Sequence, residues 1–315
     1  MPQSPAADWP AVADELNRLL RLKTTPVAMK LFERVEQMLA IPKLRRPHAI
    51  HTADQIVAQA ARLGFTVGIT QDDLVGPQCG AVLGLHPQDD EWLSGKAMTG
   101  VWFATLEDSA AHQRAMNVVP HGKYRAMAVS PLASGRLDPP DICLVYATPG
   151  QMILLINGLQ WAGYERFDWS VVGESSCADS WGRALASGKA SLSIPCFAER
   201  RYGGVADDEL LMALPPTDLP KAIAGLQALA KNGLRYPIPP YGIQADARAG
   251  ADAGRAQLRR DRLGAAAELA VGQRAALGAH AGPLGCAPAG REHEVLDARG
   301  ARVVGLGRVD RKSVV

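Results

Sequence analysis

A nearly uninterrupted apolar run that turns directly into a helix start constrains the fold more than any other feature. Residues 142–147, ICLVYA, read as a strand buried on both faces. Thr148 then suits a helix N-cap and Pro149 the first helical position, so we expect a helix through Gln160. Strands that alternate with capped helices predict an α/β or α+β fold, with helices covering a mixed sheet.

A second junction of this kind is expected later in the chain. Residues 169–172 form a short β-prone run, and Ser176 with Asp179 matches the helix start in which a hydroxyl caps and an acid lies in the first turn. The helix should end at Gly188, because glycine readily takes the left-handed conformation of a helix end. A second short strand is expected over residues 191–195.

This reading places Cys177 in the first turn of a helix. The dipole and the unpaired N–H groups there favour a thiolate. Cysteine is equally often a small buried apolar residue, so packing and reactivity both stay open. If Cys177 reacts, it is a nucleophile with Glu174 or a distant histidine as its base.

The two junctions meet at one edge of the sheet if their strands are parallel neighbours. Ligands of open α/β sheets bind outside the carboxyl ends of the strands, and helix N-termini there attract anions. We therefore expect a pocket at that edge, formed by the strand-end residues Thr148, Gly150, Glu174, Ser175 and Cys177.

Two arginines follow the second strand. Arg200 or Arg201 is suited to clamp a carboxylate or phosphate, and the competing interpretation pairs each with Asp207 or Asp208. The predicted ligand is a small anionic or aromatic molecule. One alternative to an enzyme is therefore a non-catalytic binding protein that uses helix N-termini and these two arginines.

The cysteines suggest a redox or metal function. The chain has five cysteines and no C-x-x-C pair, which argues against a secreted disulfide framework and a zinc ribbon. Cys79, Cys177 and Cys196 come from distant segments and are a candidate ligand set for a metal ion or an iron–sulfur cluster. Chance also explains three scattered cysteines. The leading hypothesis is an enzyme or a redox or metal protein with a cysteine-containing pocket.

Two smaller motifs have competing interpretations. Gly76, Gly80 and Gly84 would form one bare stripe on a helix, suited to close packing, a flat cofactor or a homo-oligomer contact. His48 and His51 have a spacing that binds metal on a helix, but they precede a helix start. Loop histidines without a third ligand are usually structural or solvated.

Composition narrows the classes of partner and location. A formal net charge of +2 gives no field that would attract nucleic acid or an anionic membrane. A hydrophobic fraction of 47% suffices for a core. The first residues do not have the pattern of a signal peptide, and no apolar run is as long as a membrane span. The expected location is the cytoplasm.

A change of composition divides the chain near Ala245. Residues 246–315 contain 17 Ala, 11 Gly and 11 Arg but no Phe, Trp, Tyr, Ile or Met. A segment this poor in large apolar residues does not easily offset its ordering entropy. We expect one globular domain over residues 1–245, and a tail over 246–315 that is disordered or a reading-frame artefact of a GC-rich gene.

Several segments resemble one protein family. They are KTTPVAMKLF, GPQCGAVLGL around Cys79, ICLVYATPGQMILLINGLQWAG, and SLSIPCFAERRYGGVADDELLMALP. Together they are similar to the family named domain of unknown function 169, over about residues 16–245. The resemblance implies an extent for the globular domain and marks these residues as candidates, and it implies no particular reaction.

Overall fold

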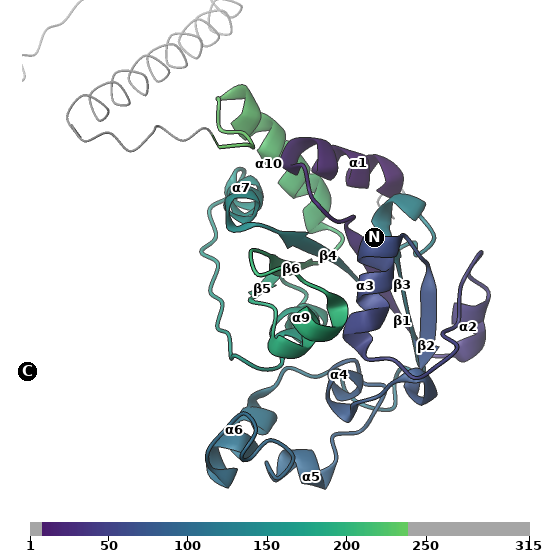
Figure 1. Cartoon of the computed structure of the whole chain (residues 1–315). Helices are drawn as coiled ribbons and strands as arrows, with labels where there is room; N and C mark the ends of the chain where they lie inside the picture. Colours follow the sequence, from purple (N-terminus) through teal and green to yellow (C-terminus); the bar gives the residue numbers. More distant parts are fainter. Residues whose placement is uncertain (1–7, 239–315) are drawn as a thin grey trace, which may run out of the picture. The chain divides into compact units, whose positions relative to one another are not determined.

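The computed structural model describes residues 8–238, which contain a six-stranded sheet in the order β2-β3-β1-β4-β6-β5 (Figure 1). All neighbouring pairs are antiparallel rather than a mixture. The strands are β1 (Val27–Phe32), β2 (Val67–Thr70), β3 (Ala126–Pro131), β4 (Ile142–Ala147), β5 (Ser191–Ser193) and β6 (Leu210–Leu214). The predicted tail, residues 246–315, lies outside the described residues.

Helices cover both faces of this sheet, which confirms the α+β class. One face carries α1 (Trp9–Leu20), α7 (Pro149–Gln160) and α10 (Asp218–Lys231). The other carries α3 (Ala53–Leu63), the helix that contains η3 (Ala178–Gly182) and α8 (Arg183–Ser187), and α9 (Phe197–Gly203). The shorter helices are α2 (Val35–Leu39), η1 (Gln71–Asp73), α4 (Pro77–Val82), α5 (Asp90–Leu93), α6 (Leu106–Ala115) and η2 (Leu132–Ser134).

Strand β4 shows why two layers of helix are needed. Its side chains alternate between the faces: Ile142, Leu144 and Tyr146 pack on the α3 side, whereas Cys143 and Val145 pack on the α7 side. All six residues of the strand are buried, as the apolar run predicts. The helix that follows is also confirmed, because the Thr148 N–H donates to Gln151 Oε1 over 2.8 Å at the start of α7.

The second junction differs from the prediction. Residues 169–172 are not a strand: Trp169 and Val171 are exposed, and the Val172 N–H donates to Asp179 Oδ2 over 3.1 Å instead of to another strand. Strand β5 pairs with β6 and not with β4. The condition for a shared pocket, two parallel neighbouring strands, is therefore not met.

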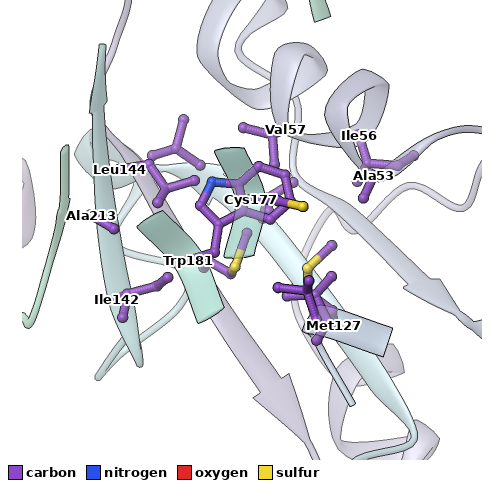
Figure 2. Close-up of a cluster of buried hydrophobic side chains, with 14 of the residues drawn as sticks. Ala53, Ile56, Val57, Met127, Ile142, Leu144, Cys177, Trp181 and Ala213 are labelled. Atoms are coloured by element: carbon purple, nitrogen blue, oxygen red, sulfur yellow. The ribbon is translucent and has the colours of Figure 1, made fainter. Parts of the chain in front are cut away.

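The helix after this connector is present. It begins at Ser176 and ends at Gly188, whose φ of 65° confirms the predicted left-handed stop. Trp181 lies on this helix with no exposed surface. Figure 2 shows it beside Cys177, among side chains that include Val57 of α3 and Leu144 of β4. This helix therefore fills the space between the sheet and α3.

The predicted glycine stripe is wrong. Helix α4 contains Gly80 alone, because Gly76 precedes it with a φ of 82° and Gly84 follows it with a φ of 70°. A Cβ at Gly80 would lie 2.1 Å from Cδ2 of His86. These glycines therefore allow tight turns around a short helix and the close approach of one imidazole.

Close helix packing occurs instead between α7 and α10, where two glycines meet. A Cβ at Gly225 would lie 1.9 Å from the carbonyl oxygen of Gly158. The two backbones approach this closely only because neither residue has a side chain.

We predict that Gly225→Ala lowers the free energy of unfolding by about 1–3 kcal/mol, because α7 and α10 must separate to admit the methyl group. Urea unfolding of the full chain measures this change. Gly163→Ala is the matched control, since no heavy atom lies within 4 Å of a Cβ built there. Equal stability of the two variants would contradict this account of the helix crossing.

Candidate functional site

Two of the three predicted cysteines are in contact. The sulfurs of Cys79 and Cys177 lie 3.4 Å apart although the residues are 98 positions apart in sequence. Cys79 belongs to α4 and is partly buried, whereas Cys177 is the second residue of the helix from Ser176 and is 3% exposed. The fold thus joins two distant segments through a pair of thiols, one of which belongs to a partly exposed residue.

The surroundings of Cys177 do not favour a thiolate in the reduced pair. Its hydrogen bond with the Cys79 thiol, and then its burial, raise the pKa of Cys177 well above the ordinary value. For Cys79, the hydrogen bond with Cys177 lowers the pKa, but burial and nearby acidic groups outweigh it and raise the pKa to about 11. At Cys177 the hydrogen bond with Cys79 and the loss of hydration therefore outweigh the helix dipole, and the raised pKa values favour the protonated form of both thiols.

A buried polar cluster adjoins the thiols. Glu174 Oε2 accepts hydrogen bonds from Gln78 Nε2 over 2.8 Å and from His112 Nε2 over 2.9 Å. The hydroxyl of Ser175 contacts the same three side chains, at 3.2 Å for His112 Nε2. Gln78 and Ser175 are close in sequence to Cys79 and Cys177, so this cluster ties together the two segments that carry the thiols.

Ser175 occupies an unusual backbone conformation. Its φ of 65° is positive, which is uncommon for a residue other than glycine and costs free energy unless the surroundings hold it. The contacts to Gln78, Glu174 and His112 supply that restraint. The turn directs the chain into the helix that presents Cys177.

His112 is the site residue that sequence reasoning missed. It lies in α6, 62 positions before Glu174, and its side chain is only 7% exposed. The ring of Phe103 lies against it, with the centroids 5.1 Å apart. The α6 sequence has no apolar periodicity that would mark one buried histidine among charged neighbours, so the sequence contains no signal for this contact.

A second buried carboxyl lies on the sheet side of the helix. Glu199 of α9 accepts hydrogen bonds from Tyr146 Oη over 2.5 Å and from Ser176 Oγ over 2.6 Å. The Cys196 N–H donates to Ser176 Oγ over 3.0 Å. Ser176 therefore does not cap its own helix as predicted, since its hydroxyl connects α9 to that helix. Burial raises the pKa of Glu199, although these hydrogen bonds oppose the rise.

Asp54, at the start of α3, is the third buried carboxyl. Burial, and then the charges of Glu199 and Glu174, raise its pKa to about 7. Its own negative charge contributes to the raised pKa of Cys79 and of Cys177. The thiols therefore lie in an acidic, poorly hydrated environment.

Thr148 and Gly150 lie apart from the thiols. They begin α7, whose Met152 and Leu155 pack on the opposite face of the sheet from Cys177. The nearest neighbour that a Cβ at Gly150 would meet is the ring of Tyr236, at 3.9 Å. The structure thus brings together Glu174, Ser175 and Cys177, and it does not place the other two predicted residues with them.

The two arginines lie in α9, a helix that sequence reasoning did not anticipate. Arg200 donates from Nε to the Pro195 carbonyl over 3.0 Å, and its Nη1 lies 3.8 Å from a carboxylate oxygen of Asp207. Arg201 is exposed, and its guanidinium lies 5.9 Å from the ring centroid of Phe197. Neither contacts the thiol pair in the described part of the chain, and their ligand-binding role stays a prediction.

The metal prediction also stays untested. In residues 8–238, no group of three or more His, Cys, Asp or Glu side chains is arranged to hold a metal ion. Cys196 precedes α9, and in the described residues its thiol forms no hydrogen bond with the other two, although its charge contributes to the raised pKa of both. None of the helices in that range combines the length and the apolar character needed to cross a membrane.

We predict a pH-dependent effect for Asp54→Asn. An unfolded aspartate titrates near pH 4, so between about pH 4 and 7 folded Asp54 retains a proton that the unfolded chain has released. The contribution of Asp54 to the free energy of unfolding therefore falls as the pH rises through this window. The free energy of unfolding of the variant, relative to that of the original chain, should therefore rise as the pH increases from about 4 to 7.

Urea unfolding at several pH values measures this change. Asp72→Asn is the control, because Asp72 is exposed. A variant whose stability differs from that of the original chain by the same amount at every pH would contradict the raised pKa.

Comparison with known proteins identifies a family. The family model of the domain of unknown function 169 (DUF169), described as "Uncharacterised ArCR", matches residues 15–225. No curated protein and no solved structure matches the chain. The match spans the described sheet, the thiol pair and the buried carboxyls. The chain therefore belongs to the DUF169 family.

Proposed function

We propose that this chain is a thiol redox protein in which Cys79 and Cys177 cycle between a dithiol and a disulfide. The observation that supports this proposal is the 3.4 Å distance between the two sulfurs. A disulfide bond is about 2.05 Å long, so the sulfurs need to approach by little more than an ångström. Two sulfurs this close, from segments 98 residues apart, can supply two electrons by forming one bond with each other.

The difference in exposure sets the order of the steps. Cys79 is partly buried and Cys177 is buried, so a small oxidant reaches Cys79 first. With a low-molecular-weight disulfide as oxidant, the Cys79 sulfur attacks one sulfur of that disulfide and displaces the other as a thiol. Cys177 then attacks Cys79 in the mixed disulfide and releases the second small thiol. The protein loses two protons and two electrons, and the small disulfide gains them as it becomes two thiols.

The raised thiol pKa values make this a slow pair at neutral pH. Only the thiolate attacks, and burial with nearby acidic groups keeps both thiols protonated. The environment thus favours a substrate that enters the site and displaces water, and disfavours indiscriminate oxidation. A small aromatic molecule that carries the oxidising group suits this poorly hydrated, acidic site better than an anion does.

We predict that oxidised glutathione converts the full-length chain into a form with a Cys79–Cys177 disulfide. Peptide mass mapping after alkylation identifies the bond. Cys79→Ser and Cys177→Ser should each abolish it, because each removes one of the two sulfurs. Cys143→Ala is the matched control, since Cys143 is buried in β4 on the opposite face of the sheet.

Disulfide bonds between other cysteines would contradict the proposal. A disulfide that uses Cys196 or Cys143 in the folded protein would contradict it, as would complete retention of free thiols at high oxidant concentration. Cys196→Ser provides the second control: the proposed pair should still form without the third thiol.

Oxidation should also stabilise the fold. The disulfide would join residues 98 positions apart and so restrict the unfolded chain. For a loop of about 100 residues, the chain-entropy model gives up to about 4.7 kcal/mol, which native strain reduces. Urea unfolding of the oxidised and reduced forms measures the difference, and Cys177→Ser should show none. An oxidised form less stable than the reduced form would show that the fold does not accommodate the bond.

A further inference from the structure

We infer that the chain has a second site, a cationic groove at the β2 edge of the sheet that binds a small molecule with a phosphate or carboxylate group. The groove has a volume of about 610 Å³. Its walls include Arg45, Arg46, His48, His51, Gln59 and Phe65. This volume lies within the range of small-molecule sites, about 300–1,000 Å³.

The loop that forms one wall is anchored at both ends. At one end, the Arg45 N–H donates to the Thr66 carbonyl over 2.8 Å, and the Arg45 carbonyl accepts from the Gly68 N–H over 2.9 Å. At the other end, the His51 N–H donates to the Asp73 carbonyl, and the His51 carbonyl accepts from the Val75 N–H, each over 2.9 Å. A loop held in this way loses little conformational freedom when it binds a ligand.

Basic side chains are concentrated among the lining residues of the groove. The lining residues contain two arginines and two histidines but no Asp or Glu. Within residues 8–238, Arg45 forms no ion pair, and its guanidinium lies 3.7 Å from the ring centroid of Phe65. The aromatic face orients the guanidinium but leaves its charge unneutralised.

Arg46 is paired with an acid that is not among the lining residues. It pairs with Asp73 Oδ2, but that oxygen also accepts from the Thr70 N–H over 2.7 Å and from Thr70 Oγ1 over 3.0 Å. One carboxylate therefore serves three donors. Among the described residues, Arg45 therefore supplies the unpaired positive charge of the groove.

The imidazole of His51 is also oriented. Its Nδ1 lies 2.6 Å from the Ala49 carbonyl oxygen, which can only accept, so Nδ1 carries a proton. Nε2 makes no hydrogen bond in the described residues, and it donates to an oxyanion when the ring also carries a proton there. The guanidinium of Arg45 matches the two oxygens of a carboxylate or phosphate, which a single imidazole cannot do. An oxyanion with a small organic part against Phe65 and Val67 fits these walls.

Isothermal titration calorimetry of the full chain tests this site, with inorganic pyrophosphate and citrate as probes at constant ionic strength. Saturable binding of pyrophosphate alone identifies a phosphate group as the ligand feature, and binding of citrate alone identifies a carboxylate. Binding of both supports the shared oxyanion chemistry. The absence of saturable binding by either probe at millimolar concentration would overturn the inference.

Matched variants locate the binding. Arg45→Ala should weaken binding by about tenfold or more, because it removes a charge-assisted pair of hydrogen bonds. Lys43→Ala removes the same charge two positions earlier from a side chain outside the groove, so it should change affinity by less than about twofold. Equal losses in both variants would overturn the inference, since they would indicate a general charge effect.

A second measurement keeps the test independent of stability. Circular dichroism confirms that Arg45→Ala is folded, and Arg45→Lys keeps the charge while it removes the two-pronged geometry. In NMR spectra, the chemical shifts of the His51 ring should change as the probe is added and should saturate at the same probe concentration as the calorimetric curve. Unchanged His51 signals at saturation would place the ligand elsewhere and overturn the assignment.

Discussion

The structure depends on a sheet whose central strand β4 is buried on both faces. Every residue of β4 is buried, with successive side chains in two separate apolar clusters. Burial of a sheet on both faces requires a layer of helix on each. On the first face, α7 and α10 approach closely at Gly158 and Gly225. On the second, the helix from Ser176 provides Trp181, which has no exposed surface.

The packing of Trp181 determines where Cys177 lies. Residues four apart share one face of a helix, so the face that presents the indole to the core also presents the thiol. Cys177 therefore faces protein rather than solvent, and its pKa rises instead of falling. The same helix approaches its neighbours closely at Gly182, where a Cβ would lie 2.2 Å from the Asn117 carbonyl oxygen. Core packing and the thiol contact are consequences of a single helix position.

Buried carboxyls distinguish this region from an ordinary core. Asp54, Glu174 and Glu199 are all buried, and the pKa of Asp54 and of Glu199 is raised by the loss of water. Elsewhere in the chain, buried Glu209 is balanced by Arg62, whose Nη2 lies 2.8 Å from its carboxylate. Near the thiols, Glu199 accepts hydrogen bonds from neutral donors such as Tyr146 instead of pairing with an arginine at this distance. Raised carboxyl pKa values in one cluster are typical of functional sites, although structural networks also produce them.

Local signals in the sequence were reliable where the interaction itself is local. Thr148 hydrogen-bonds with Gln151 across the first turn of α7, and Gly188 ends its helix with a positive φ. Residues 169–172 misled because β propensity does not provide a partner strand: β5 pairs with β6, and the connector has exposed side chains.

The site contacts depend on long-range packing that no local pattern encodes. His112 meets Glu174 across 62 residues, and Cys79 meets Cys177 across 98. The sequence could propose these cysteines because their chemistry is restricted, but it could not pair them. Histidine on a polar helix has many roles, so only the position of α6 against the Glu174 turn shows that His112 belongs to the site. Residue chemistry limits the candidates, and the tertiary fold decides which of them meet.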